Sequence, residues 1–100
     1  MAKILVVDDE TDLEVLIKQK FRKKIRDQEY EFLFAINGKD ALLKVSEHPD
    51  LDIVLSDINM PGMSGLDLLK HIKTGSIKPP PVVMMITAYG DEEILILRNV

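Results

Sequence analysis

The amino-acid sequence predicts an α/β fold, in which helices cover both faces of a doubly wound parallel sheet. The first observation is that short, continuously apolar runs recur along the chain, as in strands buried on both faces of a parallel sheet. The second is that segments with apolar residues at helical spacing separate these runs. Such an alternation forms right-handed crossovers. With 100 residues, the chain is expected to be one domain that spans residues 1–100.

The first half of the chain predicts a strand, a helix, a second strand and a second helix. These elements cover residues 4–7, 12–26, 30–36 and 40–47. The first strand is continuously apolar, and the helix after it carries apolar residues at helical spacing behind a cap at Thr11 or Asp12. An Asn37-Gly38 turn follows the second strand, and Pro49 ends the second helix.

The second half of the chain repeats this pattern. Its elements cover residues 53–56, 66–73 and 82–86, and a last helix that begins at Gly90-Asp91. The third strand leads into a loop that contains Gly62 and Gly65, and Ser64 in this loop is a candidate cap for the third helix. The last helix is predicted from its apolar residues, which are Ile94, Leu95 and Leu97.

Composition excludes several classes of protein. The net charge of −4 gives no general affinity for nucleic acid. The chain has no cysteine, which excludes disulfides and thiolate metal sites, and two histidines are too few for a histidine-rich metal cage. No apolar run approaches the roughly 20 residues of a membrane span. Because the first residues lead directly into a strand without a signal peptide, we expect a cytoplasmic location and no membrane partner.

Carboxylates follow two of the predicted strands. Asp8 and Asp9 come directly after the first strand, and Asp57 comes directly after the third. Parallel strands end at the same edge of a sheet, where open α/β sheets bind ligands. Clustered carboxylates repel one another unless a cation or a proton relieves them, so this edge is a candidate Mg²⁺ pocket with one carboxylate left for chemistry. Capping of the first helix is the structural alternative for Asp8 and Asp9.

Three stretches of sequence carry a resemblance to a known family. They are Ile-Leu-Val-Val-Asp-Asp-Glu at 4–10, Asp-Ile-Asn-Met-Pro-Gly-Met-Ser-Gly at 57–65, and Met-Ile-Thr-Ala at 85–88. In this order, with helical segments between them, they closely resemble the receiver domain of bacterial two-component response regulators. The resemblance covers essentially the whole chain and implies a flavodoxin-like fold.

The resemblance also implies a role for each site residue. Asp57 is the expected phosphate acceptor, which receives a phosphoryl group from a histidine kinase or phosphotransfer protein. Mg²⁺ is the expected cofactor, bound by the carboxylates of Asp9 and Asp57, by the backbone carbonyl of Asn59, and by Asp8 through water. Thr87 is expected to hydrogen-bond the phosphoryl group and to report phosphorylation. Such a domain phosphorylates itself but is not a turnover enzyme, and an effector domain often follows it.

The chain also departs from the family pattern. Receiver domains continue into a fifth strand and a final helix. The fifth strand begins with a lysine that pairs with the acceptor aspartate. Here the sequence stops at Val100, so we expect an incomplete domain in which the strand over 82–86 is an exposed edge. A fragment, a tail missing from the sequence, or an oligomer through that edge would each account for this.

Two other functions stay open at this stage. The missing lysine favours a receiver-like interaction module that is not phosphorylated. A Mg²⁺-dependent phosphohydrolase of the aspartyl-phosphate type is disfavoured, because Asn59 stands where such enzymes place a second acid.

Overall fold

The computed structural model describes residues 1–10, 12–75, 79–89 and 93–98, with side chains as far as Met85. The strands are β1 (Ala2–Val7), β2 (Tyr30–Ala35), β3 (Ile53–Asp57), β4 (Val82–Tyr89) and β5 (Glu93–Arg98). The helices are α1 (Asp12–Lys20), α2 (Arg22–Arg26), α3 (Gly38–Glu47) and α4 (Gly65–Lys73). The first four strands and the α3 and α4 helices lie within a few residues of their predicted positions.

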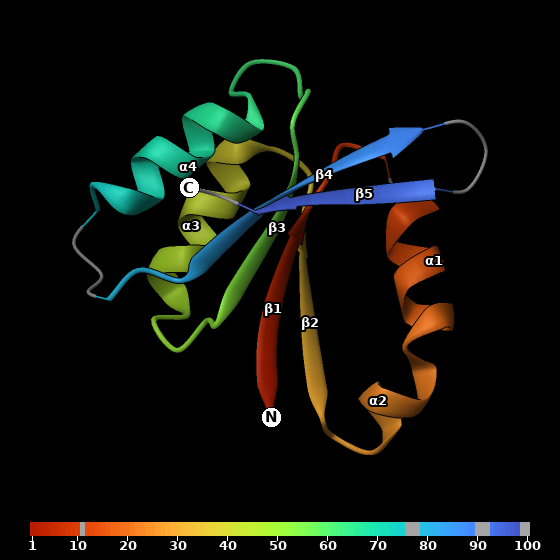
Figure 1. Cartoon of the computed structure of the whole chain (residues 1–100). Helices are drawn as coiled ribbons and strands as arrows, with labels where there is room; N and C mark the ends of the chain where they lie inside the picture. The colour runs from red at the N-terminus through yellow and green to blue at the C-terminus, as the bar shows by residue number, and fades with distance from the viewer. Residues whose placement is uncertain (11, 76–78, 90–92, 99–100) are drawn as a thin grey trace.

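The strands form one sheet in the order β2-β1-β3-β4-β5. The first four are parallel, with Val7 of β1 opposite Ala35 of β2 and Ser56 of β3. Figure 1 shows α1 and α2 on one side of the sheet and α3 and α4 on the other. The predicted α/β fold with helices on both faces is therefore confirmed.

The last predicted helix is wrong. Residues 93–98 form β5, which pairs antiparallel with β4. Three residues connect the two strands, whereas a parallel crossover needs about a dozen, so β5 can only run antiparallel. The run Ile94-Leu95-Ile96-Leu97 is also as long as a strand, and pairing it satisfies the backbone groups that β4 would otherwise expose.

This pairing also corrects the expectation that the fourth strand is an exposed edge. Among the described strands, β2 and β5 are the outermost ones. The predicted association through β4 therefore loses its structural basis.

The helix predicted over residues 12–26 is interrupted at Phe21, between α1 and α2. Helical hydrogen bonds continue across this point, because the Phe21 N–H donates to the Ile17 carbonyl at 3.0 Å and the Ile25 N–H donates to the Phe21 carbonyl at 2.9 Å. The Phe21 ring packs against Tyr30 and Phe32 of β2, with centroids 5.9 and 5.6 Å away. The interruption thus lies where the helix meets an aromatic cluster on the sheet.

Two hydrophobic cores hold the layers together. The larger lies between the sheet and the α3–α4 layer, and its fully buried members include Leu5, Val54 and Leu68. The smaller lies under α1, where Ile17 packs with Ile4 and Val6. Among the described residues, no helix is both long and apolar enough to cross a membrane.

Candidate functional site

The candidate site lies at the carboxyl ends of β1 and β3, which are neighbours in the sheet. Because Val7 is opposite Ser56 in the parallel register, Asp8, which follows β1, lies beside Asp57, the last residue of β3. Ser56 is fully buried, and its hydroxyl donates to the Asp57 carbonyl at 3.0 Å. The strand therefore presents Asp57 at a well-anchored end.

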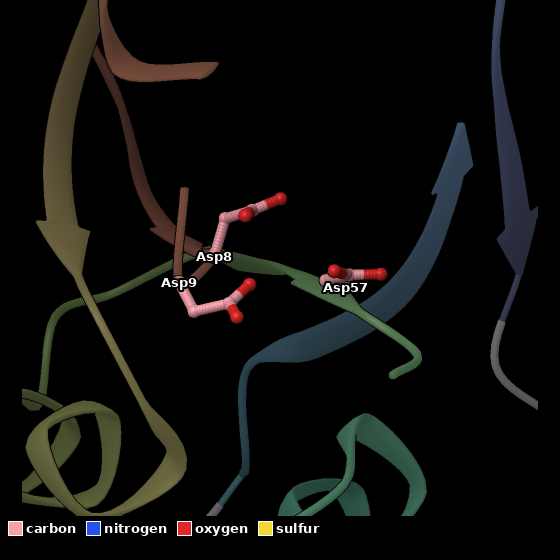
Figure 2. Close-up of side chains that lie close together, drawn as sticks. All are labelled: Asp8, Asp9 and Asp57. Atoms are coloured by element: carbon pink, nitrogen blue, oxygen red, sulfur yellow. The ribbon is translucent and has the colours of Figure 1, made fainter. Parts of the chain in front are cut away.

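Three carboxylates meet at this edge. Asp8, Asp9 and Asp57 each place one carboxylate oxygen within 4.8 Å of the others. Figure 2 shows Asp8 and Asp9 at the end of β1 beside Asp57 at the end of β3. Asp8 and Asp57 are partly buried, whereas Asp9 is exposed. The structure brings these residues together as predicted; the role of each stays a prediction.

The cluster carries an electrostatic cost. The pKa of Asp8 is raised from 3.8 to about 6, mainly by burial and in addition by the negative charges of Asp57, Asp9 and Glu10. A hydrogen bond from the Glu10 N–H to Asp8 Oδ1, 2.7 Å long, opposes this rise in pKa. Among the described residues, none of the ion pairs joins Asp8, Asp9 or Asp57 to a lysine or arginine.

The donor set fits a divalent cation. Mg²⁺ prefers oxygen ligands, keeps several of its waters, and is usually bound by one or two carboxylates rather than by a closed protein cage. A partly exposed group of three carboxylates offers that chemistry. A cation there would also relieve the repulsion that raises the pKa of Asp8.

The loop after Asp57 is closed on itself. The Gly65 N–H donates to the Ile58 carbonyl at 2.8 Å, and the Asn59 N–H donates to Asp57 Oδ1 at 3.4 Å. Gly62 has a φ of +80°, which favours glycine. Asn59 contacts Asp57 through its N–H group, so metal binding through the Asn59 carbonyl stays a prediction.

Gly65 allows close packing at the site, a role that could not be predicted from its place in the sequence. A Cβ on this residue would collide with the backbone carbonyl of Asp57 and lie 2.9 Å from Met85 Sδ. Gly65 is therefore needed for the close approach of α4 to the end of β3. No spacing in the sequence signals this contact, because it joins two different elements.

The predicted cap at Ser64 is confirmed. The Asp67 N–H donates to Ser64 Oγ at 3.1 Å, and the Ser64 N–H donates to Asp67 Oδ2 at 3.4 Å. Together these bonds form a capping box at the start of α4. The Ser-x-x-Asp spacing is the sequence signal that would have identified Asp67 as the partner.

Thr87 lies in β4, one residue beyond Ile86, the residue opposite Asp57. Its backbone is therefore near the site's edge of the sheet. Its side chain lies outside the described residues, so contact with a phosphoryl group stays a prediction.

Comparison with known proteins identifies the family. The family model "Response regulator receiver domain" matches residues 4–97. Sporulation initiation phosphotransferase F of Bacillus subtilis (strain 168) is 37% identical over 94 residues, covering 93% of this chain and 69% of that protein.

Solved structures agree with this match. The N-terminal domain of a response regulator receiver protein from Methanoculleus marisnigri JR1 has a TM-score of 0.76 at 29% identity, over 92% of this chain and 71% of that one. CheY6 from R. sphaeroides, solved in complex with the P1 domain of CheA3, has a TM-score of 0.65 at 28% identity. The match covers 84% of this chain and 61% of that one. The chain therefore belongs to the response regulator receiver domains, the phosphoacceptor modules of two-component signal transduction.

Proposed function

We propose that Asp57 is the residue that accepts the phosphoryl group, and that Asp8, Asp9 and Asp57, with the Asn59 carbonyl, hold Mg²⁺ beside it. The observation that carries this proposal is the convergence of three carboxylate oxygens within 4.8 Å of one another at the ends of β1 and β3. Asp57 is the one of the three that belongs to a strand itself and is partly buried at its end.

In the proposed reaction a weak nucleophile, the Asp57 carboxylate, attacks an anionic phosphoryl group. An Asp57 carboxylate oxygen forms a bond to phosphorus while the bond between phosphorus and the donor's imidazole nitrogen breaks. The bonding electrons stay with the imidazole, which takes up a proton. When bound, Mg²⁺ offsets the repulsion between the carboxylates and the incoming phosphoryl oxygens.

The main contribution of the neighbouring residues is to position the Asp57 carboxylate. Ser56 is fully buried and anchors the end of β3, while the Asn59 N–H holds one Asp57 oxygen at 3.4 Å. The other oxygen of Asp57 is then available as the nucleophile. Thr87, whose backbone lies beside this strand end, is proposed to contact the transferred group.

The proposed partner is a phosphohistidine on a kinase or phosphotransfer protein. The similarity to CheY6, solved with the P1 domain of CheA3, supports a partner of this class. The proposed activity is one self-phosphorylation per signal rather than turnover of a free substrate. A partly exposed group of three carboxylates suits a phosphoryl donor that another protein brings to the site.

The test is incubation with a small acyl-phosphate donor, with and without Mg²⁺, followed by intact-mass measurement. We expect one added phosphoryl group in wild-type protein with Mg²⁺, and none in Asp57→Asn. Asp50→Asn is the matched control, because Asp50 is exposed and pairs with Lys3 at the other end of β1. An adduct that persists in Asp57→Asn, or a wild-type chain that takes up no phosphoryl group, would refute the proposal.

A further inference from the structure

The start of α3 contacts the loop after Asp57 through Gly38 and Met63. Gly38 is buried, and a Cβ on it would lie 2.6 Å from Sδ, 2.8 Å from Cβ and 2.9 Å from Cγ of Met63. The space that a side chain at position 38 would fill is thus already filled by Met63. Residue 63 lies in the same loop as Asn59, between β3 and α4.

This contact constrains the loop backbone and not only a flexible side chain. Met63 Sδ can swing away by side-chain rotation, but Met63 Cβ is bonded to the backbone and can move only with it. Carbon atoms pack at about 3.5 Å or more, so a methyl group on Gly38 would need the loop to shift by roughly 0.7 Å.

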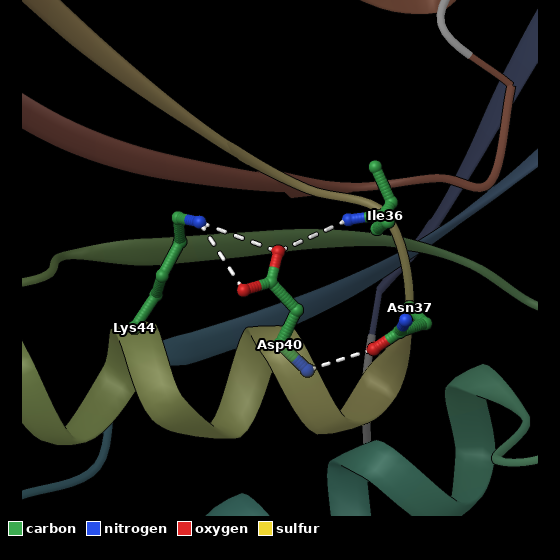
Figure 3. A network of polar contacts seen from close by, with 4 residues as sticks. All are labelled: Ile36, Asn37, Asp40 and Lys44. Carbon is green, nitrogen blue, oxygen red and sulfur yellow. Dashed lines mark hydrogen bonds and ion pairs between the residues drawn. The ribbon is translucent and has the colours of Figure 1, made fainter.

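The start of α3 is held in place, so the loop is the part that must yield. Asn37 Oδ1 accepts the Asp40 N–H at 2.8 Å, and Asp40 Oδ2 accepts the Ile36 N–H at 3.4 Å. Lys44 pairs with the same carboxylate at 3.3 Å. Figure 3 shows these bonds tying the first turn of α3 to the end of β2.

The far end of the loop is also held. The capping box of Ser64 with Asp67 fixes the residue after Met63, and the bond from Gly65 to Ile58 closes the base of the loop. A displacement of Met63 is therefore expected to move the part of the loop that precedes it. That part contains Asn59, whose N–H contacts Asp57.

We propose that Gly38 is a positioning residue for the candidate site: by leaving room for Met63, it sets the loop that places Asn59 against Asp57. The consequence for Mg²⁺ rests on the proposed function, whereas the consequence for the loop does not. In this proposal Gly38 acts through Met63, which supplies the three atoms nearest to a Cβ at position 38.

The experiment measures the loop and the metal separately. The first readout is the backbone amide resonance of Asn59 in metal-free protein, and the second is Mg²⁺ affinity by titration. Gly38→Ala is expected to shift the Asn59 resonance and to weaken Mg²⁺ binding about tenfold, since disturbing the residues that orient metal ligands costs roughly 10–100-fold in metal affinity. In a Met63→Gly background, Gly38→Ala is expected to change neither readout, because the atoms it would strike are gone.

Two controls separate position from stability. Lys39→Ala alters the exposed neighbour of Gly38 without placing an atom against Met63, and Val45→Ala removes buried volume two turns further along α3. Neither is expected to move the Asn59 resonance. If Gly38→Ala does not fold, Met63→Gly alone is expected to shift that resonance, because it removes the support from the other side.

Unchanged Asn59 resonances in Gly38→Ala, for instance because Gly62 absorbs the shift, would overturn the inference. Equal changes with and without the Met63 side chain would do the same. If wild-type protein shows no Asp57-dependent Mg²⁺ binding, the proposed function fails, and the metal-free resonances still decide the role of Gly38.

Discussion

Replacing Asp8 with asparagine tests the electrostatics of the site. Asp8 is partly buried beside two other carboxylates, and its pKa is raised to about 6, mainly by burial. Asparagine has nearly the same shape and keeps an oxygen that can accept the Glu10 N–H, now 2.7 Å from Asp8 Oδ1. The substitution therefore removes the charge and little else.

The expected gain follows from the change in pKa. A rise from 3.8 to about 6 is about two units, and each unit corresponds to about 1.4 kcal/mol, which sets a ceiling near 3 kcal/mol. Solvent screening of a partly exposed group reduces this to about 1 kcal/mol. In a domain of this size that amount raises the melting temperature by about 4–8 °C.

The gain in stability from Asp8→Asn depends on pH. Below the unfolded pKa of 3.8, Asp8 is protonated in the folded and the unfolded chain, so its carboxyl group adds no penalty. As the pH rises through about 6, the folded protein must ionise a carboxyl group whose pKa is raised, and stability is lost. Asp8→Asn is thus expected to melt higher than wild type at pH 7.5 and at the same temperature as wild type near pH 3.5.

The assay is thermal unfolding by circular dichroism in a chelator, at both pH values. Asp50→Asn is a control of opposite sign, because a hydrogen bond from Lys3 lowers the pKa of Asp50 and its loss should destabilise the protein at pH 7.5. Added Mg²⁺ should stabilise wild type more than Asp8→Asn. A metal-free Asp8→Asn protein that melts at or below the wild-type temperature at pH 7.5 would refute the reasoning.

Two further predictions concern the neighbours of the site. Gly65→Ala is expected to cost about 1–3 kcal/mol in urea unfolding, because its Cβ would strike the Asp57 carbonyl, whereas Gly75→Ala meets its nearest atom at 3.3 Å and should cost less. Equal costs for the two variants would argue against a tight approach at Gly65. Ser64→Ala removes the acceptor for the Asp67 N–H and should cost about 1 kcal/mol, with Ser64→Asp, which can still cap, close to wild type. A loss of similar size in Ser64→Asp would show that capping is not the cause.

The sequence was most informative where local pattern and topology agree. Continuous apolar runs predicted β1, β3 and β4, and the rule that parallel strands end at one edge predicted that Asp8 and Asp57 would meet. The pattern could be read because each signal lies within a few consecutive residues. The cap at Ser64 was likewise predicted from a local pattern.

The sequence was misleading where a short apolar run fits two structures. The residues at 94–97 suit a short helix or a strand, and only the vacant edge of β4 decides between them. Contacts between different helices, strands and loops also could not be predicted from the sequence. Nothing in the spacing of Gly38 or Gly65 indicates that Met63 or the Asp57 carbonyl lies against it.

The placement of the acidic residues on β1 and β3 bears on the order of folding. α1, α2, β2 and α3 all lie between these strands in sequence, so Asp8 and Asp57 become neighbours only when a long-range pairing forms. Closing so long a loop is entropically costly before any contact is gained. The same pairing also brings like charges together, so the site opposes the step that builds it. A divalent cation would then act on assembly of the sheet as well as on the finished site, and the folding rate should rise with its concentration if β1 and β3 pair in the transition state.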